Sequence, residues 1–473
     1  MHGLKFGAMV AALLAAGLPA WGETTVLKNV TVIDGTGAAP APASAIVMTD
    51  GKIAWVGPMA SLKAPMDAKV RDMSGKFVIP GIIDSHVHVG IMHDVTQDIK
   101  YYTRENVEAD LGTYAAYGVT AVQILGTDKD IIFDIRKEQR AGRPSNARVF
   151  TSGQGEVFKG GYGGVYGLNE MVSTPDEARK SVDIQAAKGV DFIKFWMDDE
   201  RKTIPVKMTY EVSAAIIDQA HKHHLKAVAH IFYLDDAKEL LREGVDGFAH
   251  MVRDQPVDKE FLDMMKARGA WQVSPTLSRE MAFSLAIMPW LQDPFFTRGV
   301  TPGTLDALRG PAREKAVVLG ATRFPGLPYE KKVFADMDRT LFQTLENYQA
   351  MVQAGVNTGM GTDSGPNGRF PGFNAHEEMQ LEVMAGRSPM DAIKSATSDN
   401  ARWLGDASIG SIEVGKWADL VVLEKNPLDD IRNTQTIAAV YIAGNSVPTI
   451  WQTCRDRAAK ACTGGATLPV MPY

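Results

Sequence analysis

Between the two ends of the chain, hydrophobic positions follow two alternating periods. Short apolar runs bounded by turn signals are followed by segments in which apolar residues recur every three or four positions. Residues 174–196 show one such unit. TPDE at 174–177 forms a capping box with proline at the first helical position, the helix ends at Gly189, and VDFIKFW follows as a strand. The pattern therefore predicts repeated strand–helix units.

Eight strands are predicted in this way, at VIPGIIDSHVH, GVTAVQIL, ARVFTSG, VDFIKFW, LKAVAH, VDGFAHM, AWQVSPTL and VNTGMGTD. Strands that alternate with helices indicate an α/β fold, and eight units predict a (β/α)8 TIM barrel over residues 80–407. A helical insertion near 280–345, rich in Met, Phe and Pro, interrupts the last unit. A connection of this length is typical of a lid over a binding site, and a surface excursion or an oligomer contact is the equal alternative.

The two flanks of the barrel have a different pattern. Residues 23–79 and 408–450 consist of short β-rich pieces separated by turn signals such as Asp34-Gly35. We expect both flanks to form one small β-sandwich domain. Residues 451–473 form a C-terminal tail that holds Cys454 and Cys462, either joined in a disulfide or present as two thiols.

Residues 1–22 have the layout of a secretory signal peptide. Lys5 precedes an apolar run from Phe6 to Leu18, and small residues follow at Ala20 and Gly22. A membrane anchor is the alternative, but the run is shorter than the ~18 apolar residues that a span requires. We therefore expect a periplasmic or secreted protein that has no membrane association once the signal is removed.

Composition narrows the class of partner. The chain has 473 residues, 45% hydrophobic and 22% charged, which is ordinary for a globular protein. Its net charge is −6 and it has no basic cluster, so it is not expected to bind nucleic acid. A small-molecule substrate is the expected partner, and a homo-oligomer remains open.

Histidines mark the ends of several predicted strands. Side chains alternate along a strand, so Asp84, His86 and His88 share one face. In a barrel this face points inward, at the end where such folds keep their active sites. His230 and His250 end two further strands in the same way. Together these imidazoles indicate a metal site.

Two other residues extend this constellation. Asp363 ends the last predicted strand, and Lys194 lies inside an otherwise apolar strand. Burial of an unpaired ammonium is costly, so Lys194 requires an anionic partner, a lowered pKa or carboxylation by CO2 to a metal-bridging carbamate. By contrast, the histidines of HKHH (221–224) lie late in a helix, where cations suit the helix dipole, and we interpret them as a solvated helix end.

These motifs have a counterpart in a known family. PGIIDSHVHVG, FIKFW, AVAH, GFAHM and GTDSG, in this order, resemble the metal-dependent amidohydrolase superfamily. The flanks KNVTVIDGTG, GKIAWVGP and GSIEVGKWADLVVL resemble its terminal β segments. Within the superfamily, the chain is most similar to the branch of prolidase-like dipeptidases, peptide carboxypeptidases and ochratoxin-type amidases, and imidazolonepropionase is a more distant relative.

The resemblance implies two divalent metal ions, usually zinc. The implied ligands are His86, His88 and Asp363 for the buried ion, His230 and His250 for the exposed ion, and carboxylated Lys194 as the bridge between them.

The chain departs from the family at two positions. Tyr162 occupies the place of a histidine in FKGGYGG, and the aromatic pair after His230 is Phe232-Tyr233. Together with the exposed metal ion, Tyr162 and Tyr233 are the candidates for polarising the substrate carbonyl.

The two metal cations implied by the resemblance suggest a mechanism of hydrolysis. Two cations about 3.5–4 Å apart can share a hydroxide, and Asp363 beside it is the natural general base. We therefore expect an exported hydrolase of amide bonds in dipeptides or N-acyl amino acids. Alternatives are a hydrolase of cyclic amides, lactones or phosphoesters at the same site, a mononuclear variant, or a small-molecule binder without catalysis.

Overall fold

The computed structural model describes residues 23–163, 167–199, 201–202, 204–283, 289–310, 331–366 and 368–453. The predicted signal peptide, Cys454 and Cys462, and part of the predicted insertion lie outside these ranges. Among the residues within them, none of the helices has the length and apolar character needed to cross a bilayer.

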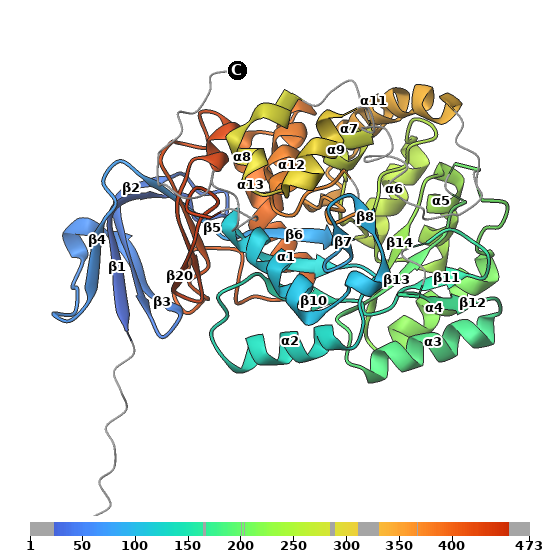
Figure 1. The fold of residues 1–473 in the computed structure, drawn as a ribbon, viewed down its shortest axis with the longest axis horizontal. Helices are drawn as coiled ribbons and strands as arrows, with labels where there is room; N and C mark the ends of the chain where they lie inside the picture. The colour runs from blue at the N-terminus through green and yellow to red at the C-terminus, as the bar shows by residue number, and fades with distance from the viewer. Residues whose placement is uncertain are drawn as a thin grey trace, which may run out of the picture.

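Strands from both chain ends form one mixed sheet that lies to one side of the molecule (Figure 1). Its order is β20-β19-β18-β5-β1-β2-β3, and β4 also pairs with β1. The strands are β1 (Thr24–Val32), β2 (Ala41–Thr49), β3 (Lys52–Pro58), β4 (Lys69–Asp72), β5 (Phe77–Pro80), β18 (Leu420–Leu423), β19 (Ile437–Ile442) and β20 (Asn445–Val447). The antiparallel pair of β5 and β18 joins the two flanks, with Val78 opposite Val422.

The rest of the chain is α/β with parallel sheets, as the sequence predicts. One sheet has the order β10-β9-β6, and a second has the order β12-β11-β13-β14-β15-β16-β17. The strands are β6 (Ile82–Val87), β9 (Val119–Ile124), β10 (Arg148–Thr151), β11 (Glu156–Phe158), β12 (Glu170–Val172), β13 (Phe192–Trp196), β14 (Lys226–His230), β15 (Gly247–Phe248), β16 (Trp271–Gln272) and β17 (Asn357–Thr358). A small hairpin pairs β7 (Met92–His93) with β8 (Thr96–Gln97).

Helices follow most of these strands and pack around them (Figure 1). They are α1 (Arg104–Ala116), α2 (Ile131–Ala141), α3 (Pro175–Ala187), α4 (Tyr210–Lys222), α5 (Leu234–Glu243), α6 (Lys259–Arg268), α7 (Leu277–Phe283), α8 (Pro294–Thr297), α9 (Pro302–Arg309), α11 (Lys331–Gln353), α12 (Phe373–Met384), α13 (Pro389–Lys394) and α14 (Asn400–Leu404). The predicted start of α3 is confirmed, because the Thr174 hydroxyl accepts from the Glu177 N–H at 3.2 Å. The predicted end of this helix is also confirmed, because Gly189 follows the C-cap residue of α3 with a φ of +77°.

The run VIPGIIDSHVH, predicted as one strand, is divided at Gly81. β5 before it belongs to the terminal sheet, and β6 after it belongs to a parallel sheet. A Cβ at Gly81 would lie 2.0 Å from Thr120 Oγ1, and the Gly81 N–H donates to the Asp419 carbonyl at 2.8 Å. The close approach explains why glycine stands where the chain passes from one sheet to the other.

Backbone hydrogen bonds bring the segment after β17 alongside the end of β6. The Asp363 N–H donates to the His86 carbonyl at 2.7 Å, and the His88 N–H donates to the Ser364 carbonyl at 2.7 Å. Val87 and Ser364 form an isolated parallel bridge. The loop that carries Asp363 is therefore fixed against the strand that carries His86.

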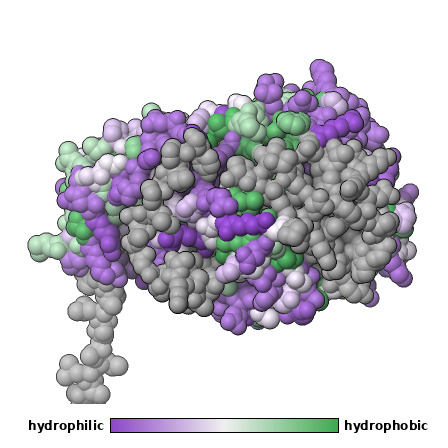
Figure 2. All heavy atoms as spheres, turned by 45° about the horizontal axis from the view of Figure 1, so that its top comes forward, coloured by the Kyte–Doolittle hydropathy of each residue, from purple (hydrophilic) through white to green (hydrophobic). Residues whose placement is uncertain are grey.

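Figure 2 shows one face of the molecule, on which hydrophilic residues prevail among those coloured and apolar residues gather in small groups. The large apolar side chains that are exposed in the described part of the chain include Met66, Phe342, Met384 and Val414. Phe342 lies on α11, within the predicted insertion.

A buried carboxyl on β11 predicts a pH dependence of stability. Burial raises the pKa of Glu156 from 4.5 to about 8, against the opposing effect of the Ser181 hydroxyl, which donates at 3.1 Å. The folded state therefore holds a proton that the unfolded chain loses above pH 4.5, so this residue lowers stability as pH rises from 4.5 to 8. In Glu156→Gln this contribution disappears. Relative to wild type, its free energy of unfolding should rise by up to about 1.4 kcal/mol per pH unit in this window, measured by urea titration. If the free energies of unfolding of wild type and variant differ by the same amount at every pH in this window, the pKa of Glu156 is not raised.

Candidate metal centre

The predicted ligands lie on parallel strands or beyond their carboxyl ends. His86 is on β6 and Lys194 on β13, and His230 is the last residue of β14. His88 follows β6, whereas His250 and Asp363 lie beyond β15 and β17, in loops rather than at strand ends. Every one of these side chains is buried. The ends of neighbouring parallel strands meet at one face of the fold, so distant segments converge there.

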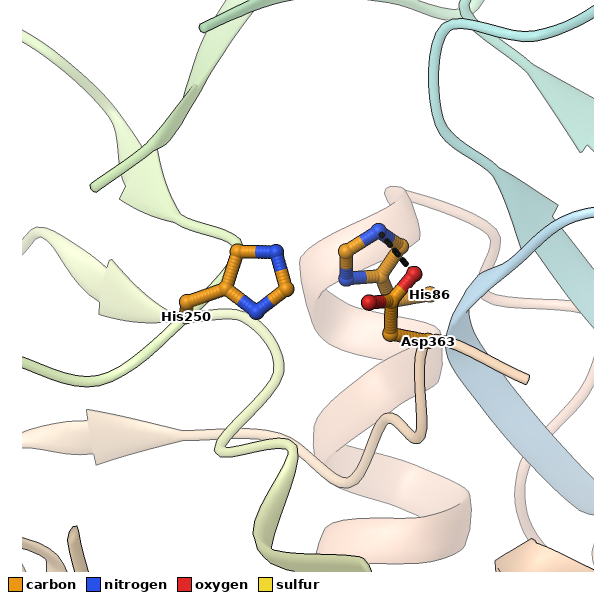
Figure 3. A group of neighbouring side chains, drawn as sticks. All are labelled: His86, His250 and Asp363. Carbon is orange, nitrogen blue, oxygen red and sulfur yellow. Dashed lines mark ion pairs between the residues drawn. The ribbon is translucent and has the colours of Figure 1, made fainter. Parts of the chain in front are cut away.

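Three of these residues form a compact group. Ligand atoms of His86, His250 and Asp363 all lie within 4.8 Å of one another. In Figure 3 the His86 ring lies against the Asp363 carboxylate, and His250 faces them from a separate segment. His86 Nε2 is 3.5 Å from Asp363 Oδ1. Two imidazoles and one carboxylate at this spacing can hold a divalent cation.

The other histidines adjoin this group. His88 Nε2 lies 2.8 Å from Asp363 Oδ1. The rings of His230 and His250 have their centroids 4.1 Å apart, and His230 Nε2 lies 3.1 Å from Asp198 Oδ2. The four histidines therefore form a continuous set of imidazoles beside one carboxylate.

Hydrogen bonds orient three of the imidazoles. His86 Nδ1 lies 3.1 Å from the Ala249 carbonyl, which can only accept, so Nδ1 donates and Nε2 carries the lone pair. The Nδ1 atoms of His88 and His250 lie 2.6 Å and 3.1 Å from threonine hydroxyls. Burial lowers the pKa of all three imidazoles, well below the usual value for His86 and His250. Neutral rings held through Nδ1 are suited to metal binding through Nε2.

Lys194 is an amine held among these groups. Its side chain is fully buried, and its Nζ has no hydrogen-bond partner in the described part of the chain. Burial lowers the pKa of Lys194 to about 7, although the carboxylates of Asp363 and Asp198 favour the charged form. An ammonium without a hydrogen-bond partner is costly at a buried site, and the lowered pKa favours the neutral amine.

Asp363 is held by cations on the side away from the imidazoles. Its backbone has a φ of +55°, an uncommon conformation that the hydrogen bond to His86 maintains. Arg369 donates to Oδ2, and Arg279 Nε lies 3.0 Å from the same oxygen. Burial alone would raise the pKa of Asp363, but Arg369 and the two neighbouring histidines hold it well below its usual range. The side chain is thus a fixed carboxylate.

The two candidate tyrosines differ in position. The Tyr162 ring is buried with its centroid 5.1 Å from that of His230, so it adjoins the predicted ligands. The Tyr233 hydroxyl donates to Asp199 Oδ1 at 2.6 Å. In this structure the Tyr233 hydroxyl therefore donates its proton to a carboxylate outside the predicted ligand set, and not toward the predicted ligands.

Asp84 and the HKHH segment lie outside the compact group. Asp84 accepts from the Thr362 hydroxyl at 2.7 Å and from the Thr362 N–H at 3.1 Å, and thereby holds the residue before Asp363. His221 and His223 lie at the exposed end of α4 and pair with Asp246 and Asp183. The prediction of a solvated helix end is confirmed.

Three residues of the site were not predicted from the sequence: Asp198, Arg279 and Arg369. If the period of two is continued past the end of β13 at Trp196, Asp198, four positions after Lys194, falls on the same face. That signal was present in the sequence. The two arginines lie on α7 and in the loop after Asp363, and no local pattern marks them.

Part of the predicted insertion reaches the neighbourhood of the site. Val300 and Thr301, just before α9, line a cavity together with Arg369 and Phe370. Because Arg369 also binds Asp363, this cavity borders the predicted ligands.

The chemistry of the donor set fits divalent metal ions. Burial favours the neutral form of His86, His88 and His250, and their Nδ1 atoms have partners. His86 Nε2 lacks a hydrogen-bond partner within the described residues. The carboxylate of Asp363, which has a low pKa, and the amine of Lys194, which can be neutral at pH 7, complete the set of donor groups. Nitrogen and oxygen donors of this kind suit zinc and several other divalent ions.

Comparison with known proteins agrees with this chemistry. Residues 77–447 match the model of the amidohydrolase family. Ochratoxinase of Aspergillus niger is 24% identical over 457 residues, which cover 88% of this chain and 85% of that protein. Imidazolonepropionase of Fusobacterium nucleatum is 23% identical over 427 residues, which cover 85% of this chain and 88% of that protein. The crystal structure of a candidate prolidase from Bifidobacterium longum superposes with a TM-score of 0.70 at 26% identity, covering 91% of this chain and 96% of that chain.

The fold and the site define a metal-dependent α/β hydrolase. The chain belongs to the amidohydrolase family, and the predicted resemblance is confirmed. It is a hydrolase that acts on carbon–nitrogen bonds.

Proposed function

We propose that this protein hydrolyses the amide bond of a peptide-like substrate, such as a dipeptide or an N-acyl amino acid. The observation that carries the proposal is the convergence of His86, His250 and Asp363 within 4.8 Å, with Lys194 buried beside them. The likeness to ochratoxinase and to a candidate prolidase supports the choice of substrate class. An exported form, cleaved after residue 22, is part of the proposal.

In this proposal the site holds two divalent ions, with zinc as the first candidate. His86, His88 and Asp363 would hold one ion, His230 and His250 the other, and Lys194, carboxylated by CO2, would contact both. Such ions supply Lewis-acid activation of water and of the scissile carbonyl. The oriented Nε2 atom of His86 and the unpartnered Nζ of Lys194 support this assignment.

The residues of the chain have separate tasks in this scheme. Asp363 accepts the proton of the attacking water and passes it to the leaving nitrogen, which must be protonated to depart. Arg279 and Arg369 fix the carboxylate in place for this transfer. Tyr162, which adjoins His230, is the better placed of the two tyrosines to donate to the substrate carbonyl.

The proposal includes closure of the parallel strands into a (β/α)8 barrel. The hydrogen bonds from Asp363 to His86 and from His88 to Ser364 support closure between β6 and the segment after β17. Between the other ends of the two sheets, the Gly155 N–H, just before β11, donates at 3.0 Å to the Gly126 carbonyl, just after β9. The cavity beside Arg369 supports a lid role for the residues before α9.

Metal analysis combined with a hydrolysis screen tests the function. We expect close to two equivalents of divalent metal per chain, and turnover of dipeptides or N-acyl amino acids that is lost with chelator and restored by zinc. Preferred cleavage of cyclic amides, lactones or phosphoesters would instead select the alternative hydrolase. One equivalent with full activity would select the mononuclear form. Metal binding without turnover of any of these classes would indicate a binding protein.

A further inference from the structure

Asp198 is a buried carboxylate beside the candidate metal centre that the predicted ligand set does not include. Its side chain is fully buried, and its Oδ2 lies 3.1 Å from Nε2 of His230. Its negative charge also acts on Lys194, whose ammonium form it favours. Asp198 therefore adjoins two of the residues predicted to hold the exposed ion.

The backbone fixes Asp198 next to the end of β14. β13 and β14 pair in parallel with Trp196 opposite His230. The pairing continues past the end of β13, because the Met197 N–H donates to the His230 carbonyl at 3.1 Å. Asp198 is the next residue along the chain. Its position relative to His230 is thus set by backbone hydrogen bonds as well as by the side-chain rotamer.

The segment after His230 is held by Arg253. Its Nη2 donates to the Ile231 carbonyl at 2.7 Å, and its Nη1 donates to Glu280, on α7, at 2.8 Å. The chain is therefore fixed by hydrogen bonds on both sides of the pair formed by Asp198 and His230.

The spacing of this pair suits two ligands of one ion. Donor atoms bound to zinc at about 2.0–2.2 Å, at angles of about 90–110°, lie about 2.8–3.6 Å apart. The distance of 3.1 Å between His230 Nε2 and Asp198 Oδ2 lies within this range. So do the distances from Asp363 Oδ1 to His88 Nε2, 2.8 Å, and to His86 Nε2, 3.5 Å. The pair thus repeats the geometry of the ligands predicted for the buried ion.

Without Asp198 the predicted ligand sets of the two ions are unequal. The buried ion has two imidazoles, the Asp363 carboxylate and the carbamate of Lys194, whereas the exposed ion has only two imidazoles and the carbamate. Addition of Asp198 gives each ion two nitrogen and two oxygen donors from the chain. The second carboxylate also offsets the charge of the second cation, which would be costly to leave uncompensated at a buried site.

We propose that Asp198 is a ligand of the exposed ion, in addition to His230 and His250. This inference rests on the proposed two-ion centre and goes beyond it, since the resemblance to the family implies no ligand at this position. It predicts that the second ion is held by a carboxylate of this chain and is lost when that carboxylate is removed.

Zinc titration of the full chain, stripped of metal by a chelator, tests the inference without an assay of turnover. Affinities are measured by competition with a chromophoric chelator. Asp198→Ala should bind the first ion as wild type does and the second at least about 100-fold more weakly, because replacing an outer partner of a ligand costs only about 10–100-fold. A smaller loss, or none, would overturn the inference.

Cobalt distinguishes a ligand from a hydrogen-bond partner. A hydrogen bond between His230 Nε2 and Asp198 has a similar length, but the carboxylate would then not contact the ion. The visible absorption of the second equivalent of Co²⁺ reports the groups bound to it, and it should change in position or intensity in Asp198→Ala. An unchanged spectrum would overturn the inference even if the affinity falls.

Asp199→Asn is a matched control in the same loop. The Asp199 carboxylate accepts from the Tyr233 hydroxyl at 2.6 Å and from the Lys202 N–H at 2.9 Å, outside the predicted ligand set. Both zinc affinities of this variant should equal those of wild type. A loss as large as that in Asp198→Ala would show that any change in the loop disturbs the site, and would overturn the inference.

A second variant guards against a failure to fold. Melting temperature is measured for every variant. If Asp198→Ala does not fold, Asp198→Asn, which keeps the size of the side chain and removes its charge, provides the same comparison. An unchanged second zinc affinity in Asp198→Asn would then overturn the inference.

The outcomes separate this inference from the proposed function. If wild type binds two ions and the second depends on Asp198, but no amide is cleaved, the ligand assignment stands and only the proposed reaction falls. If wild type cleaves amides and its metal affinities do not depend on Asp198, only the ligand assignment falls. If wild type binds no divalent ion, both fall.

Discussion

Replacement of Lys194 by alanine is expected to reduce turnover by about 10³-fold or more, because a bridging ligand supports several kcal/mol of transition-state stabilisation. The lowered pKa of Lys194 supports the proposed carbamate at this position. With its pKa lowered to about 7, the buried amine is neutral in a large fraction of molecules at neutral pH. The neutral Nζ can attack dissolved CO2, forming an N–C bond with release of one proton. Kinetics of the purified variant, with metal analysis, measure the effect.

Chemical rescue and isotope labelling sharpen this prediction. Short-chain carboxylic acids should restore part of the activity of Lys194→Ala, since a free carboxylate can occupy the place of the carbamate. Wild type equilibrated with ¹³C-bicarbonate should show a carbamate carbon by NMR that the variant lacks. Lys226→Ala is a matched control, because Lys226 is also a strand lysine but is only partly buried and donates to the Trp403 carbonyl. Full activity of Lys194→Ala would refute the bridge.

Much of the fold could be predicted because its signals are local. Capping residues and the glycines after α5 and α6 mark helix ends in the sequence itself, and the structure has left-handed backbone at Gly244 and Gly269. Strand–helix alternation sufficed to predict the α/β class. The division at Gly81 was not predicted, since the neighbour that requires glycine, Thr120, is distant in sequence. Strand length was overestimated at β15 and β17, whose regular pairing ends after two residues.

In the candidate site, too, residues marked by a local sequence pattern could be predicted, and residues brought in by tertiary packing could not. Imidazoles at strand ends are visible in the sequence because the strand period and the fold class place them on one face. The arginines around Asp363 and Glu280 could not be found in this way, because α7 and the loop after β17 reach the site only through tertiary packing. Charge balance at a buried site depends on such distant partners. For this reason the candidate ligands could be proposed from the sequence, whereas the arginines that balance their charge could not.

Replacement of Asp363 by asparagine is expected to leave at least one metal bound yet reduce turnover on the order of 10²–10⁴-fold, the contribution of a positioned general base. Asparagine keeps an oxygen that can face His88, as Oδ1 does at 2.8 Å, but it cannot accept a proton. Its neutral side chain also leaves Arg279 and Arg369 without their shared carboxylate. Stopped assays with metal analysis on the same sample separate loss of metal from loss of catalysis.

A second variant distinguishes the role of Asp363 as a base from a general effect of removing a buried carboxylate. Asp419 pairs with Arg148 at 2.8 Å where the terminal sheet meets β10, with side chains only 3% and 11% exposed. Asp419→Asn should lower the free energy of unfolding, because it breaks a buried ion pair, yet retain normal kcat per folded, metal-loaded molecule. If Asp363→Asn keeps near-normal rates with its metal in place, Asp363 is not the base. Proton transfer must then pass through another buried carboxylate, and Asp198, 3.1 Å from His230, is the next to be replaced.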